Sequence, residues 1–189
     1  MPIRAIALDV DGVLTDGGFW WGPNDEEWKR FSFSDVMGLS LARKAGLRLA
    51  LITGEKSPIV DRLANKMGVT DVYQDCKDKA RALRSLAEQH HLRLEDICFM
   101  GDDINDLSAL EIAGLAAAPA DARSAVLEKC QFITKATAGN GAVRELIDHL
   151  LAHSAIDRGA GPLNRRARWG RTRPAGLPST STCQARVLA

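Results

Sequence analysis

Two aspartates one residue apart, Asp9 and Asp11, carry the first chemistry that the sequence offers. They follow the apolar run 5–8, and Gly12 comes directly after them. A short apolar run that ends at a turn signal is typical of a buried strand. We therefore expect both carboxylates at the point where a central strand leaves its sheet. Carboxylates at such a point serve as nucleophiles, as general acids and bases, or as metal ligands.

Polar side chains stand at three further junctions between a strand or loop and a helix. They are Thr53, Lys79 and the acids Asp102, Asp103 and Asp106. The carboxyl ends of parallel strands meet at one edge of a sheet, where ligands bind. Carboxylates gathered there repel one another unless a cation shares the site, and all-oxygen ligation suits Mg²⁺. A lysine and a threonine hydroxyl beside the cation suit a phosphoryl group, so the set predicts phosphoryl transfer.

The elements that must position these residues alternate between strand and helix. Strands are expected at 5–8, 47–52, 71–73, 97–100, 115–118 and 131–134, and helices at 36–45, 58–67, 77–90, 105–113, 122–129 and 141–152. This alternation predicts an α/β fold, a Rossmann-like doubly wound parallel sheet with helices on both faces. We expect Asp35 to cap the first helix.

A small β-hairpin is expected between the first strand and the first helix. The turn signal Gly22-Pro23-Asn24-Asp25 separates the segments 19–21 and 28–33. Three tryptophans, Trp20, Trp21 and Trp28, fall within it. So much exposed aromatic surface predicts that the hairpin packs against something else, such as another subunit.

Length and composition predict one folded domain over 1–152 and a basic, disordered tail over 153–189. The first part has a net charge of −5 and the tail of +6, and the tail is rich in Gly, Pro, Arg, Ser and Thr. No apolar run approaches the roughly 20 residues of a membrane span. Because the folded part is not basic, no nucleic-acid partner is expected. The cysteines show no CxxC spacing and the chain enters a strand at once, so we expect reduced thiols and a cytoplasmic protein.

Four of these segments together resemble a known family. The segments are Asp9-Val10-Asp11-Gly12-Val13, Thr53-Gly54, Lys79 and Gly101-Asp102-Asp103-x-x-Asp106. In order and spacing they resemble the four motifs of the haloacid dehalogenase-like hydrolases, over about residues 1–150. The resemblance implies a phosphatase that works through an aspartyl phosphate.

The resemblance also implies a role for each matched residue. Asp9 would be the nucleophile, and Asp11 the general acid and then the base. Thr53 and Lys79 would hold phosphate oxygens. The implied Mg²⁺ ligands are Asp9, Asp102 and the backbone carbonyl of Asp11. Two further acids, Asp103 and Asp106, would orient Lys79 and metal-bound waters from behind the ligands.

A particular branch of the family is favoured by what the chain lacks. Between Asp11 and the second strand there is room for a hairpin and one helix, and between Thr53 and Lys79 for still less. No cap domain fits in either place. The chain resembles the cap-less 3-deoxy-octulosonate 8-phosphate phosphatases and their relatives. That resemblance implies a homotetramer assembled through the hairpins, in which a neighbouring subunit helps to close each active site.

One residue departs from the octulosonate enzymes, which usually have arginine after the Thr-Gly pair. Here Gly54 is followed by Glu55, which would repel a substrate carboxylate and prefers hydroxyl or amine donors. Lys66, three helical turns further on, would restore a positive charge. The pair resembles the phosphatases for nine-carbon sugar acids, so we favour a nonulosonate 9-phosphate as substrate, bound by Thr53, Gly54, Glu55, Lys66 and Lys79. The octulosonate 8-phosphate is the alternative.

Two other classes of protein are alternatives to a phosphatase. A signalling receiver domain also gathers acids, a hydroxyl, a lysine and Mg²⁺, but it takes its phosphoacceptor from the third strand rather than the first. A catalytically idle assembly domain would have the fold without the full set of residues. The order of the motifs argues against the first, and the complete set argues against the second.

Overall fold

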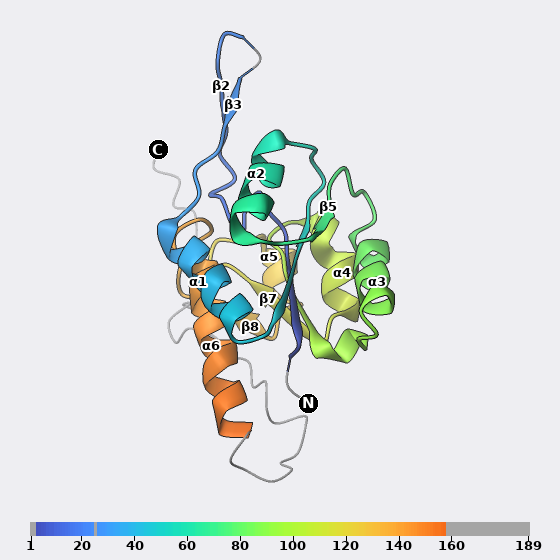
Figure 1. Ribbon diagram of the computed structural model, residues 1–189. Helices are drawn as coiled ribbons and strands as arrows, with labels where there is room; N and C mark the ends of the chain where they lie inside the picture. The colour runs from blue at the N-terminus through green and yellow to red at the C-terminus, as the bar shows by residue number, and fades with distance from the viewer. Residues whose placement is uncertain (1–2, 25, 158–189) are drawn as a thin grey trace, which may run out of the picture.

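A parallel sheet of six strands forms the centre of the computed structural model, which describes residues 3–24 and 26–157 (Figure 1). The strand order is β5-β4-β1-β6-β7-β8. The strands are β1 (Ala5–Leu8), β4 (Arg48–Ile52), β5 (Asp71–Tyr73), β6 (Ile97–Met100), β7 (Leu115–Ala118) and β8 (Phe132–Ile133). Every neighbouring pair is parallel. The predicted α/β fold is confirmed.

Helices cover both faces of the sheet. One face packs against α1 (Phe33–Lys44), α2 (Pro58–Met67) and α6 (Ala142–Asp157), and the other against α3 (Lys79–Gln89), α4 (Leu107–Ile112) and α5 (Ser124–Leu127). In β1, Ile6 and Leu8 enter the first core while Ala5 and Ala7 enter the second. Because strand side chains alternate, a strand buried on both faces is apolar throughout. Short 3₁₀ turns, η1 (Leu94–Asp96) and η2 (Ile104–Asp106), precede β6 and α4.

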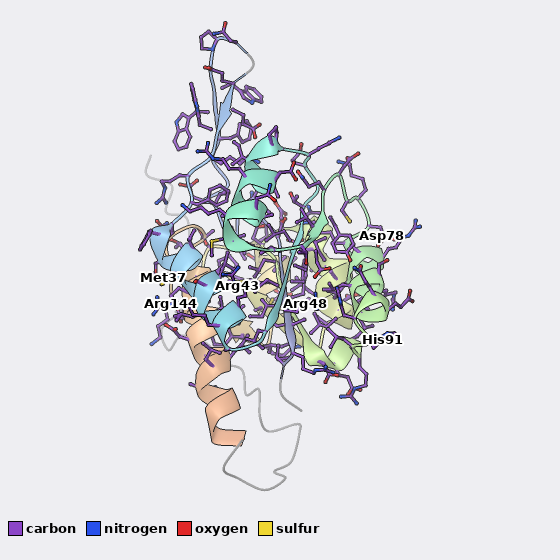
Figure 2. The ribbon with its side chains drawn as sticks, viewed as in Figure 1. Met37, Arg43, Arg48, Asp78, His91 and Arg144 are labelled. Carbon is purple, nitrogen blue, oxygen red and sulfur yellow. The ribbon has the colours of Figure 1, made fainter. Side chains whose placement is uncertain are left out.

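The helices α1 and α6 lie side by side (Figure 1), and a buried carboxylate joins them. Asp35 accepts hydrogen bonds from the backbone N–H groups of Gly141 (3.0 Å) and Arg144 (2.9 Å), at the start of α6. Our expectation that Asp35 caps its own helix was wrong, because α1 begins two residues earlier, at Phe33. Figure 2 shows Met37 of α1 and Arg144 of α6 at this junction.

The hairpin β2 (Trp20–Trp21) and β3 (Glu27–Trp28) projects from the body of the molecule (Figure 1). The second strand ends at Trp28, well short of the expected residue 33, because the next two side chains turn back to the body. Trp20, Trp21 and Trp28 are 54%, 75% and 52% exposed. The described part of the chain therefore leaves at least half of each tryptophan uncovered.

Two expectations concern the end of the chain. The last helix continues to Asp157, five residues beyond the expected end at 152. From residue 158 onward the expected basic tail lies outside the described residues, as does Cys183. The described cysteines, Cys76, Cys98 and Cys130, are free thiols. No helix in the described part of the chain is long and apolar enough to span a membrane.

Candidate active site

Three carboxylates meet at the carboxyl edge of the sheet. Asp9 directly follows β1, Asp102 comes two residues after β6, and Asp106 closes η2. Each offers an oxygen within 4.8 Å of the others. The strands β1 and β6 are neighbours, and the chain order reverses at this point of the sheet. Such a switch point is where open α/β sheets bind ligands.

A buried lysine joins two of these carboxylates. Lys79, the first residue of α3, is 1% exposed. Its Nζ lies 2.8 Å from Asp9 Oδ2 and 2.6 Å from Asp106 Oδ1. Burial alone would lower the pKa of the Lys79 ammonium, but Asp9 and Asp106 outweigh burial and leave the pKa raised. Lys79 therefore stays charged beside Asp9.

Asp106 is fully buried and braces the loop after β6. Its Oδ2 accepts the backbone N–H groups of Asp102 (2.9 Å) and Asp103 (3.2 Å), while Oδ1 binds Lys79. Gly101 makes this possible, because a β-carbon there would overlap the Asp106 carboxyl group. Asp106 thus fixes Lys79 and the backbone that presents Asp102.

The carboxyl groups of Asp9 and Asp102 both have pKa values above the ordinary range. Burial, and next the charge of Asp106, raises the pKa of Asp9 to about 7, although Lys79 acts in the opposite direction. Burial followed by the charge of Asp9 likewise raises the pKa of Asp102 to about 7. One ammonium does not balance three clustered carboxylates. The donor set, all oxygen and short of positive charge, fits a divalent cation such as Mg²⁺.

The carboxylate of Asp11 points elsewhere, although it is only two residues from Asp9. Its Oδ2 lies 2.8 Å from Nζ of Lys29, at the base of the hairpin. Its Oδ1 accepts a hydrogen bond from the Thr15 hydroxyl (3.3 Å). Sequence reasoning missed Lys29, because nothing in the expected strand 28–33 indicated that this side chain reaches Asp11.

The residues expected to bind substrate are only partly brought together. Thr53 is buried at the end of β4, and its hydroxyl oxygen accepts the backbone N–H of Glu55 (3.3 Å). The Glu55 side chain is exposed beside it. Lys66 is exposed in the last turn of α2, about 12 Å along the helix from its first residue. The structure therefore does not bring Lys66 to the acid cluster of its own chain.

Gly54 and Asp103, which the sequence also placed at the site, contact residues outside the acid cluster. The carbonyl oxygen of Gly54 accepts a hydrogen bond from Lys77 Nζ (2.9 Å). Asp103 faces away from Lys79: one oxygen accepts the N–H of Ile104 (2.7 Å) and the other lies 3.5 Å from Arg123 Nε. Of the two acids expected behind the metal ligands, only Asp106 contacts Lys79.

An acid cluster with a buried lysine, at the switch point of a parallel sheet, fits a protein that carries out phosphoryl transfer. A family model for haloacid dehalogenase-like hydrolases matches residues 52–146. The chain belongs to this family. The membership argues against a receiver domain, and together with the relatives described next it confirms the prediction of a phosphatase.

Several relatives are similar over most of their length. The chain is 37% identical to the Escherichia coli 3-deoxy-D-manno-octulosonate 8-phosphate phosphatase KdsC over 160 residues, which cover 84% of this chain and 85% of the relative. The Yersinia pestis enzyme of that name has a similar structure, with a TM-score of 0.80, 34% identity and coverage of 85% and 87%.

A third relative carries ligands. The Moraxella catarrhalis 3-deoxy-D-manno-octulosonate 8-phosphate phosphatase, solved with magnesium ion, phosphate ion and KDO, matches with a TM-score of 0.78 and 34% identity. The match covers 82% of this chain and 92% of that one. The magnesium ion in that structure and the acid cluster described above both support the predicted Mg²⁺ cofactor.

Proposed function

We propose that this protein is an Mg²⁺-dependent phosphomonoester hydrolase that removes phosphate from a sugar-acid phosphate through an aspartyl phosphate on Asp9. One observation carries the proposal: at the end of the central strand, Asp9 contacts the Lys79 ammonium (2.8 Å) and offers an oxygen within 4.8 Å of one from Asp102. A nucleophile beside both a fixed cation and a metal site is what attack on phosphorus requires.

The first half-reaction forms the intermediate. A carboxylate oxygen of Asp9 attacks phosphorus, and the bond between phosphorus and the sugar oxygen breaks. The carboxylic acid of Asp11 gives its proton to the departing sugar oxygen, so the sugar leaves as a neutral alcohol. Lys79 holds a phosphate oxygen. Thr53 does the same, since its oxygen accepts from Glu55 and its own hydrogen is left to donate.

The second half-reaction restores the enzyme. The carboxylate of Asp11 takes a proton from water while the water oxygen attacks phosphorus. The bond between phosphorus and Asp9 breaks, which releases inorganic phosphate and the Asp9 carboxylate. Asp11 is then protonated for the next cycle. One residue can serve as acid and base because each step leaves it in the form that the next step needs.

Asp9, Asp102 and the backbone carbonyl of Asp11 would hold Mg²⁺. The bound ion would offset the negative charge that builds up on the transferring phosphoryl oxygens. Asp106 serves the site without binding the ion, because one oxygen is committed to Lys79 and the other to two backbone N–H groups.

The substrate that we favour is a nonulosonate 9-phosphate. Glu55, exposed beside Thr53, supports it, because it stands where the octulosonate enzymes usually have an arginine and a carboxylate prefers hydroxyl or amine donors. The second candidate, 3-deoxy-D-manno-octulosonate 8-phosphate, is supported by the names of the relatives. Steady-state kinetics on both compounds distinguish them, and a kcat/KM that is higher on the octulosonate 8-phosphate would contradict our choice.

The proposal includes a homotetramer in the cytoplasm, in which a neighbouring subunit helps to close the active site. The exposed aromatic side chains of the hairpin, Phe19, Trp20, Trp21 and Trp28, support it. Light scattering on the purified protein tests the assembly. A monomer at micromolar concentration would contradict it, and Trp21→Ser should shift the protein towards smaller species.

Phosphate release tests the activity itself. Wild-type protein should release phosphate from a sugar-acid phosphate only when Mg²⁺ is present. Asp9→Asn keeps the shape of the side chain but removes the nucleophile, and it should abolish release. A wild-type protein that releases no phosphate from any sugar-acid phosphate would instead indicate an idle assembly domain.

A further inference from the structure

Lys29 forms an ion pair with Asp11 that lies outside the acid cluster. The distance from Lys29 Nζ to Asp11 Oδ2 is 2.8 Å, and the lysine side chain is 3% exposed. Lys29 belongs to the hairpin arm, directly after β3. A buried ammonium is unfavourable unless an anion pairs with it. Asp11 is the nearer of the two carboxylates that pair with this buried charge, the other being Glu27.

Both oxygens of the Asp11 carboxylate are held, each from a different side. Lys29 holds Oδ2, and the Thr15 hydroxyl donates to Oδ1 over 3.3 Å. Thr15 is itself fully buried, and its oxygen accepts the N–H of Gly17 (3.2 Å). These two contacts hold the Asp11 carboxyl group in one orientation, which sets the direction in which it can exchange a proton.

Hairpin residues on either side of Lys29 help to hold it in place. Glu27 Oε1 lies 3.7 Å from Lys29 Nζ and accepts a hydrogen bond from the Ser57 hydroxyl (3.1 Å), at the start of α2. On the other side of Lys29, Arg30 Nη2 donates to Asn140 Oδ1 (2.8 Å). Contacts to two separate parts of the body thus fix the base of the hairpin around Lys29.

We propose that Lys29 is a positioning residue that sets the orientation of the Asp11 carboxyl group for proton transfer. The inference rests on the proposed function, in which Asp11 is the acid and base. It gives the hairpin a second role, because the segment that carries the exposed tryptophans also carries the residue that places Asp11. A displacement of a reacting group by about 1 Å can cost on the order of 10²-fold in rate.

Two other roles for Lys29 make different predictions. If Lys29 only held the hairpin in place, its loss would lower stability and leave the turnover of folded enzyme unchanged. If it bound the substrate phosphate, its loss would raise KM and would do so whether or not Asp11 is present. A positioning role lowers kcat and acts only through Asp11.

A double-mutant cycle on the full chain separates these roles. The four proteins are wild type, Lys29→Met, Asp11→Asn and the double variant, assayed with Mg²⁺ on 2-keto-3-deoxy-nononate 9-phosphate, 3-deoxy-D-manno-octulosonate 8-phosphate and p-nitrophenyl phosphate. Lys29→Met should lower kcat on the faster sugar phosphate by about 10- to 100-fold and change KM by less than about threefold. In the Asp11→Asn background the same change should cost less than about twofold. Lys29→Arg, which keeps the charge, should recover part of kcat.

A second lysine variant and measurements of thermal stability provide the controls. Lys129→Met removes another ion-paired lysine, 3.4 Å from Glu111 on the surface, and should leave kcat and the melting temperature unchanged. Thermal unfolding of the four cycle proteins tests the contact without substrate. The double variant should lose less stability than the two single losses added together. Additive losses would show that the pair does not form.

The results of these assays distinguish a failure of the inference about Lys29 from a failure of the proposed function. A wild-type protein that releases no phosphate from any of the three compounds overturns the proposed function, and Lys29 with it. An active wild type whose kcat is unchanged by Lys29→Met overturns the role of Lys29 alone. So does a loss of equal size in the presence and absence of Asp11.

Discussion

Gly12 and Asp102 face each other so closely that a β-carbon on Gly12 would overlap the Asp102 carboxyl group. Gly12 also has a positive φ of 82°, which side chains rarely adopt. The loop after β1 and the loop after β6 therefore meet at a position that only glycine fits. This contact sets Asp102 beside Asp9, and it explains why glycine follows the second aspartate.

Gly12→Ala should disable the site by displacing Asp102. We expect kcat/KM to fall by at least about 100-fold, since a misplaced metal ligand removes charge stabilisation from the transition state. Gly46→Ala is the matched control, because Gly46 has a φ of 85° but no atom within 4 Å of the added carbon. It should cost only about 1 kcal/mol of stability and leave kcat/KM intact. Equal losses of activity would mean that strain alone is responsible.

Mg²⁺ should stabilise the protein more at high pH than at low pH. The pKa values of Asp9 and Asp102 are raised to about 7 from an ordinary value of 3.8. The metal-free folded state then holds protons that the unfolded state has lost, so its stability falls as pH rises from about 4 to about 7. Mg²⁺ binds the ionised carboxylates and should reverse the loss.

Thermal unfolding with and without MgCl₂ at pH 5.5 and pH 8 measures this effect. The rise in melting temperature on adding the ion should be larger at pH 8. KCl of matched ionic strength controls for screening of surface charges. A rise of the same size at both pH values would show that Mg²⁺ does not bind these carboxylates.

Asp35→Ala should destabilise the junction of α1 and α6. The change leaves the N–H groups of Gly141 and Arg144 without their cap, which costs about 1–2 kcal/mol. In a domain of this size that corresponds to a fall in melting temperature of roughly 2–8 °C. Asp148→Ala, which removes a surface partner of Arg144 (2.9 Å), should cost less than about 1 kcal/mol. If the two variants melt together, Asp35 does not act as a cap.

The sequence was most informative where function depends on local pattern. Asp9 directly follows one buried strand and Asp102 comes two residues after another, so the alternation of strands and helices was enough to bring both to one edge. Lys79 could be placed for the same reason, since it opens a helix at that edge.

Contacts between distant segments could not be predicted in this way. The side chain of Asp35 reaches a helix more than one hundred residues later, and nothing in its neighbourhood distinguishes it from a local cap. Lys29 meets Asp11 only because the hairpin folds back onto the body through Arg30 and Asn140. The pattern also suggested that Lys66 restores a charge near Glu55, but it did not show how far along α2 that residue lies.

The most direct test of the whole account is the identity of the phosphorylated residue. Wild-type enzyme mixed with its sugar-phosphate substrate and Mg²⁺ is quenched with acid within the first turnovers and reduced with borohydride, which converts an aspartyl phosphate to homoserine. Peptide mass spectrometry should find homoserine at position 9, and none in Asp9→Asn or without substrate. An active enzyme in which position 9 stays aspartate, while another residue carries the modification or none does, would contradict Asp9 as the nucleophile.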